Sequence, residues 1–189
     1  VQIAREAKSQ TVMSKEIKVG VPETHSKKDM PAENQKTELI ASKVAVIKEF
    51  NSWAEKSELK KNVVLDSAVL EEGIELAKSR RQALKELIQL DPKVALENKM
   101  AFGLKSILPE EIINYLEDNF SIKGNLDVLA TTPLQNETAQ INRFVTIKNK
   151  TYEAFVYGRR ATQTTKNNIN LHGISIDSVA AVDENPLRV

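Results

Sequence analysis

The sequence predicts an α+β protein in which an N-terminal helical region packs beside a small C-terminal antiparallel sheet or partly closed barrel. Between Thr37 and Phe120 the apolar residues recur with the 3.6-residue period of helices, whereas beyond Leu126 they alternate every second residue. Because helices and strands fall in separate blocks, the order favours α+β over a doubly wound parallel sheet. We divide the chain into a flexible segment 1–36, a helical region 37–120 and an antiparallel β region 121–189.

The N-terminal segment is polar and contains few large apolar side chains. Val12, Ile17 and Val19 favour at most a short strand, and the stretch 20–34 carries two prolines and a charge cluster that are typical of a linker. A segment of this composition cannot offset the entropy of its own ordering unless it docks on something else. We therefore expect residues 1–36 to be flexible.

The first helix is expected from Thr37, which can cap its N-terminus, to about Lys61. Its apolar positions form a broad face, and the basic pair at residues 60–61 suits a helix C-terminus. Trp53, the only tryptophan, lies on this apolar face. We interpret Trp53 as a core or interdomain packing residue.

Three more helices are expected before the β region. The second begins at Asp66 or Ser67, ends near Leu90 and packs antiparallel on the first. Asp91 can cap a short third helix with Pro92 at its first position. A fourth opens at Pro109 and turns four apolar residues inward: Ile112, Ile113, Leu116 and Phe120.

The β region is predicted from side-chain alternation with a period of two. It gives a first strand around residues 126–129, a hairpin of residues 144–147 and 152–157 with its turn at Asn149-Lys150, and a strand within 169–176. Gly158 is expected to end the hairpin, Asn167-Asn168 to form a loop, and Gly173 to mark a bulge or bend.

Composition excludes several classes of function. A net charge of +1 and an aromatic share of 5% argue against a nucleic-acid partner, which would need a basic surface or stacking platforms. The absence of cysteine excludes disulfides, cysteine-ligated zinc and a thiol nucleophile. No apolar run approaches the roughly 18 residues of a membrane span, and no glycine-rich phosphate-binding motif occurs. We expect no metal and no cofactor.

A few residues remain as chemical candidates, each with a structural alternative. His172 is either a hydrogen-bonded structural residue or a base, and a catalytic role would require it to share a cleft with Asp177. Arg159 and Arg160 either bind an anion or are solvated and salt-bridged. The carboxylates of residues 177, 183 and 184 favour turn capping over metal binding, because they lack the spacing of a calcium loop.

The C-terminal half also resembles a known kind of protein region. The pattern consists of Tyr152-x-Ala154-Phe155-Val156-Tyr157-Gly158-Arg159-Arg160, Thr164-Thr165-x-x-Asn168-Ile169-x-Leu171-His172-Gly173-Ile174-x-Ile176-Asp177, Ala181-Val182 and Pro186-x-Arg188-Val189, preceded by Leu108-Pro109 and Gly124-x-Leu126-x-Val128-Leu129. It is similar to N-terminal, pro-region-like segments of large secreted bacterial multidomain proteins, some of them metalloprotease-like. No binding or catalytic residues come with this resemblance.

The resemblance implies a non-catalytic interaction region or pro-region, secreted or at the cell surface, that assists folding of or covers a downstream module of the same polypeptide. A first residue that is not methionine is compatible with export. The alternative is a stand-alone binding module for a surface glycan or peptide. The residues expected to bind a ligand or partner are Tyr152, Tyr157, Arg159, Arg160 and His172.

Overall fold

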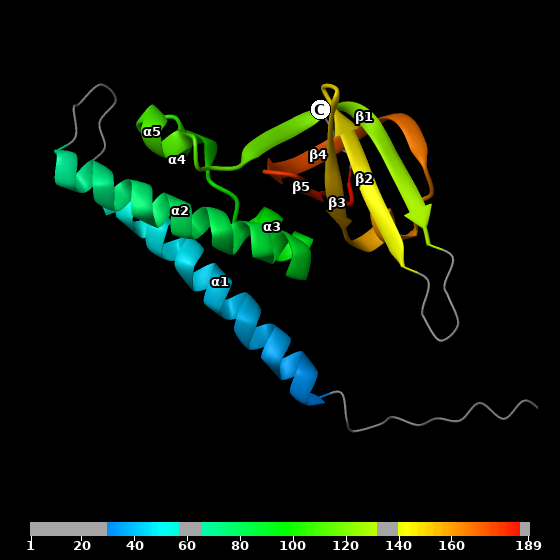
Figure 1. Cartoon of the computed structure of the whole chain (residues 1–189), viewed down its shortest axis with the longest axis horizontal. Helices are drawn as coiled ribbons and strands as arrows, with labels where there is room; N and C mark the ends of the chain where they lie inside the picture. The colour runs from blue at the N-terminus through cyan, green and yellow to red at the C-terminus, as the bar shows by residue number, and fades with distance from the viewer. Residues whose placement is uncertain (1–29, 57–65, 132–139, 186–189) are drawn as a thin grey trace, which may run out of the picture.

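The protein has an α+β fold, as the sequence predicts. A computed structural model describes residues 30–56, 66–131 and 140–185. Helices come first along the chain, and strands that close into a barrel follow (Figure 1). The expectation of flexibility for residues 1–29 lies outside the described residues.

Helix α1 (Met30–Lys56) begins before the expected cap at Thr37. Thr37 lies inside the helix, where its hydroxyl donates a hydrogen bond of 2.9 Å to the carbonyl of Glu33. A hydroxyl that bonds back to residue i−4 is the interior alternative to capping, and the sequence does not distinguish the two. Residues 30–36, expected in the flexible segment, are therefore helical.

Helix α2 (Ser67–Leu90) packs antiparallel on α1, as expected (Figure 1). Its predicted start is confirmed, because the Asp66 side chain accepts a hydrogen bond of 3.2 Å from the Ala68 N–H. Contacts at the two ends fix the direction: Lys43 forms an ion pair with Glu86, while Trp53 packs against Gly73. Trp53 also contacts the core around Phe50, so its interpretation as a packing residue is confirmed.

Three short helices lead to the strands: α3 (Pro92–Glu97), α4 (Phe102–Lys105) and α5 (Glu110–Ile113). The predicted cap of α3 is confirmed by a 3.0 Å bond from the Val94 N–H to the Asp91 carboxylate. The predicted extent of the fourth helix is wrong, since Phe120 belongs to a strand. Phe120 fills the barrel interior, and its spacing from the apolar residues of α5 resembles a helical period only by coincidence.

Within the described residues, five strands close into a barrel in the order β1-β2-β3-β5-β4. They are β1 (Asp118–Ala130), β2 (Ile141–Ile147), β3 (Lys150–Val156), β4 (Lys166–Ile176) and β5 (Val179–Val182), with a 3₁₀ helix η1 (Gly158–Thr162) between β3 and β4. The expected antiparallel pairing is wrong for β3 and β5, which run parallel. The chain reverses direction after β4, so that β5 runs antiparallel to β4 and parallel to its other neighbour, β3.

The turns differ from the predicted ones in detail. The β2–β3 hairpin turns at Lys148-Asn149, one residue earlier than expected, and both residues have positive φ (49° and 63°). The pairing of β1 with β4 shifts its register between Gly124 and Leu126 of β1. The bulge or bend expected at Gly173 is not found, because β4 continues through this residue. Gly173 is needed for a close approach instead, because a Cβ there would lie 2.1 Å from the Ala181 carbonyl oxygen.

The short strand β5 joins the helices to the barrel. Val179 and Ala181 pack in a core shared with α1, α2 and α3, whereas Ala180 and Val182 point into the barrel interior. Asn168, expected in a loop, belongs to β4 with φ 54°, and Gly158 begins η1 two residues after β3 ends. Because β5 is buried on both faces, the helical layer and the barrel share a continuous packed interior.

Candidate functional site

A buried ion pair fixes the start of the barrel against the helices. Arg80 of α2 and Glu117, which precedes β1, are both fully buried and form two hydrogen bonds of 2.5 and 3.0 Å. The same carboxylate accepts a 2.6 Å bond from the Met100 N–H. Burial alone would raise the pKa of Glu117, but the hydrogen bonds and positive charge of Arg80 outweigh it and leave the pKa below its usual value.

A second ionic contact holds the β4–β5 turn on α2. Asp177, with φ 52°, accepts a hydrogen bond from Arg81 and forms an ion pair of 3.1 Å with Lys85. The hydrogen bond from Arg81 is the main cause of the lowered pKa of Asp177. Arg81 also donates to the carbonyl of Tyr115 at 3.1 Å, so α2, the chain after α5 and the β4–β5 turn meet at one guanidinium.

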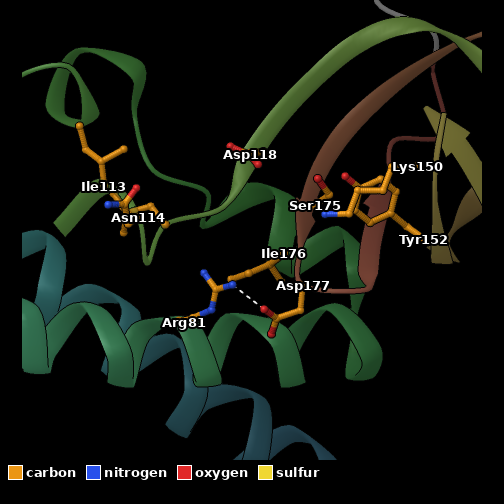
Figure 2. Close-up of a pocket in the computed structure, with 10 residues that line it drawn as sticks. Arg81, Ile113, Asn114, Asp118, Lys150, Tyr152, Ser175, Ile176 and Asp177 are labelled. Atoms are coloured by element: carbon orange, nitrogen blue, oxygen red, sulfur yellow. Dashed lines mark hydrogen bonds and ion pairs between the residues drawn. The ribbon is translucent and has the colours of Figure 1, made fainter. Parts of the chain in front are cut away.

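These contacts border a cleft of about 330 Å³ at the junction of helices and barrel, which we call the mouth cleft (Figure 2). Its apolar wall comes from Ile113, Leu116 and Ile176. Its polar lining consists of Arg81, Asn114, Asp118, Lys150, Tyr152, Ser175 and Asp177. The cleft thus collects side chains from α2, the end of α5, the start of β1, the start of β3 and the end of β4.

The barrel register explains why these polar groups meet. Asp118 of β1 is paired with Ser175 of β4, so both lie on the same rung at the end of the ladder. From β3, Lys150 Nζ lies 4.9 Å from the centroid of the Tyr152 ring. The lining therefore combines a partly exposed aromatic ring with carboxylate, amide, hydroxyl and cationic groups, a set that suits a polar organic ligand.

The structure places the five sequence-predicted site residues in two locations. Tyr152 lines the mouth cleft. The other four surround the chain that leaves β5 at residues 183–185, and we call this group the exit clamp: Tyr157, Arg159, Arg160 and His172.

The exit clamp is held together by hydrogen bonds to residues 183–185. Arg160 is only 2% exposed and donates to the Asp183 carbonyl, while the Arg159 N–H donates to the Glu184 carboxylate at 3.2 Å. The His172 carbonyl accepts a 2.8 Å bond from the Asp183 N–H. Burial first, and then the charge of Asp183, raises the pKa of Tyr157.

Two expectations about these residues need correction. The alternative of a solvated, salt-bridged Arg160 is wrong, because its guanidinium is buried and donates to backbone carbonyls. The catalytic hypothesis required His172 and Asp177 in one cleft, yet Asp177 lines the mouth cleft while His172 does not. Within the described ranges, no group of three or more acidic or histidine side chains is arranged to hold a metal ion.

Sequence reasoning missed most of the mouth cleft. Arg81, Asp118 and Ser175 carry no motif, and they meet only through the fold. The sequence does contain one signal for the buried Arg80–Glu117 pair, which lies beside the mouth cleft. Arg80 stands at core spacing between Ala77 and Leu84 of α2, and a charged residue at such a position indicates a buried partner.

The strand order and pairing define the fold as a closed five-stranded barrel, preceded by helices, in which β3 runs parallel to β5 and the other neighbouring strands are antiparallel. No family model, curated protein or solved structure matches the chain. A fold of this kind hosts many functions, so a function must be argued from the site. Among the described helices, none has the length and apolar character that a membrane crossing requires.

Proposed function

We propose that the chain is a non-catalytic binding module whose mouth cleft takes a short segment of a surface glycan. The observation that carries this proposal is the lining of the cleft, which includes Tyr152 together with Asp118, Asn114 and Ser175 (Figure 2). An aromatic ring offers an apolar face to a sugar ring, and the carboxylate, amide and hydroxyl groups can bond sugar hydroxyls as acceptors or donors.

The charges of the cleft favour a sugar over a nucleic acid. Asp118 and Asp177 place two carboxylates in the lining against two cations, Arg81 and Lys150, and Arg81 is already bonded to Asp177. Nucleic-acid affinity depends on an excess of positive charge that neutralises phosphates. The mouth cleft has no such excess, and the whole chain has a net charge of +1.

Rigidity of the junction also supports binding at this place. The buried Arg80–Glu117 pair and the Asp177 contacts lie next to the cleft and fix the elements that supply its lining. A cleft that keeps its shape without ligand binds with a smaller entropic cost than one that must be ordered on binding.

The proposal is tested by measuring binding of the 189-residue chain to an array of neutral and charged oligosaccharides. Asp118→Asn should weaken binding to the selected oligosaccharide roughly tenfold, because a hydrogen bond to a charged group is worth about 1.5 kcal/mol or more. Tyr152→Leu should weaken binding by a similar factor, because it removes the aromatic face that contacts the sugar ring, worth about 1 kcal/mol, together with the phenol hydroxyl. Matched controls are Phe102→Leu, which removes an 84% exposed aromatic ring elsewhere, and Asp127→Asn on the same strand β1. Absence of binding to every sugar, or equal losses in the controls, would contradict the proposal.

A second candidate function follows from the exit clamp. We propose as the alternative that the chain is the N-terminal interaction region or pro-region of a secreted bacterial protein and covers a downstream module. Arg160 donates to the backbone carbonyl of Asp183, and Arg159 donates to the side chains of Glu184 and Asn185. These bonds hold residues 183–185 as the chain leaves β5, which suits a region that must keep a following module in one orientation.

The pro-region alternative makes its own prediction. The purified chain, added in excess to the mature downstream enzyme, should slow that enzyme, and the native product should be found outside the cell. An enzyme that keeps its full rate, or a product confined to the cell interior, would count against this alternative without affecting the glycan proposal's binding test.

A further inference from the structure

A second cleft, of about 380 Å³, lies between the middle of β1, the start of β4 and η1. We call it the basic cleft. Its cationic residues are Lys123 of β1, Lys166 of β4 and Arg160 of η1. Side-chain amides of Gln163, Asn168 and Asn170 complete most of the remaining lining. The cleft shares Arg160 with the exit clamp and has no residue in common with the mouth cleft.

The charge of the basic cleft is unbalanced. Among its lining residues, three cations face a single carboxylate, that of Glu184. In the part of the chain that the structure describes, neither Lys123 nor Lys166 forms an ion pair, whereas Arg81, Lys85 and Lys43 do. Two unpaired ammonium groups beside a guanidinium create a local positive potential that attracts an anion.

Arg160 provides a fixed positive group at this cleft. Its guanidinium donates to the carbonyls of Asp183 and of Asn170, the latter at 2.9 Å, and to the Gln163 side chain at 3.4 Å. A guanidinium has five N–H donors, and three of them are bonded here. Because Arg160 is buried, it acts on a ligand through its charge, whereas the exposed Lys123 and Lys166 supply the direct contacts. Because Arg160 is 2% exposed and bonded both to β4 and to the chain that follows β5, its position does not depend on a ligand.

We infer that the basic cleft binds the sulfate group of a sulfated sugar. The positive charges account for the anionic group, and the amides of Asn168, Asn170 and Gln163 can bond the sugar hydroxyls beside it. A nucleic acid is a poorer match, because no aromatic residue stands among the lining residues to stack a base. This inference is independent of the mouth cleft and holds whether or not that cleft binds a glycan.

The test is calorimetric titration of the 189-residue chain with a heparin-type sulfated tetrasaccharide and with its fully desulfated counterpart. The sulfated sugar should bind, binding should weaken as sodium chloride is added, and the desulfated sugar should bind at least roughly tenfold more weakly. The double variant Lys123→Gln/Lys166→Gln should lose roughly tenfold in affinity for the sulfated sugar while melting at the same temperature as the wild type.

Two further variants separate a site from general charge attraction. Lys48→Gln/Lys99→Gln removes the same charge from exposed lysines of α1 and of the chain between α3 and α4, and it should leave affinity unchanged. Glu184→Gln removes the carboxylate of the basic cleft but keeps an oxygen that can accept the Arg159 N–H, so affinity should rise. Equal binding of the two sugars, an equal loss in the control double variant, or a loss of affinity in Glu184→Gln would overturn the inference.

Discussion

Gly73→Ala should destabilise the protein, although the same change stabilises most helices. In a helix interior, alanine is about 1 kcal/mol more favourable than glycine. Gly73 is buried in α2, however, and an ideal Cβ there would lie 2.2 and 2.6 Å from two ring carbons of Trp53 and 2.8 Å from a methyl of Ile112. Because the Trp53 ring also packs beside Phe50, with 5.8 Å between centroids, it cannot move away without disturbing the α1–α2 core.

The expected size of the effect follows from two opposing terms. Overpacking of a well-filled core costs about 1 to 3 kcal/mol, and the helix-propensity gain offsets about 1 kcal/mol of it. The free energy of unfolding should therefore fall by about 0 to 2 kcal/mol, and a Cβ contact as short as 2.2 Å places Gly73→Ala toward the upper end of that range. Urea unfolding followed by Trp53 fluorescence and by far-ultraviolet circular dichroism measures this change.

A matched control is available in the same protein. Gly103 lies in α4, where a Cβ would meet no atom within 4 Å, so Gly103→Ala should leave the free energy of unfolding unchanged or raise it. If Gly73→Ala proves as stable as the wild type or more stable, the close packing of Trp53 on Gly73 is not present in solution.

The remaining predictions concern the charges at the junction. Glu117→Gln breaks a fully buried pair with Arg80 and should lower the free energy of unfolding by about 3 to 5 kcal/mol, measured by urea unfolding at pH 7; an unchanged midpoint would contradict the structural role. Because the folded-state pKa values of Glu117 and Asp177 are lowered, their stabilisation is present above the unfolded carboxyl pKa of about 4 and is lost as pH falls through the folded values. The urea concentration at the midpoint of unfolding should therefore decrease as the pH is lowered below about 4. This decrease should be less steep in Glu117→Gln. Asp177→Asn should cost less than about 1 kcal/mol, because this pair is partly exposed, and a loss as large as that of Glu117→Gln would show that exposure to be wrong.

The parts of the fold that the sequence predicted correctly depend on local chemistry. The start of α2 at Asp66 and the cap of α3 at Asp91 each rest on a side chain bonded to a backbone N–H two or three residues away. The β2–β3 hairpin rests on strand alternation and on an asparagine that accepts positive φ. Such signals lie within a few residues and can be read without tertiary structure.

The parts that could not be predicted depend on distant contacts. The partners Arg80 and Glu117 are 37 residues apart, and Arg81 and Asp177 are 96 apart. The parallel pairing of β3 with β5 is likewise set by closure of the barrel. For the same reason Tyr152 could be singled out as a contact residue by type, whereas Asp118 and Ser175 become part of the cleft only through the β1–β4 register.

The most direct test of the mouth cleft as the ligand site is a nuclear magnetic resonance titration of the ¹⁵N-labelled chain with the oligosaccharide that the array selects. We expect the backbone amide shifts to concentrate at Asp118, Tyr152, Ser175 and Asp177, which line the cleft from separate strands and turns. If the shifts fall on other elements and these four amides stay unchanged, the mouth cleft is not the binding site.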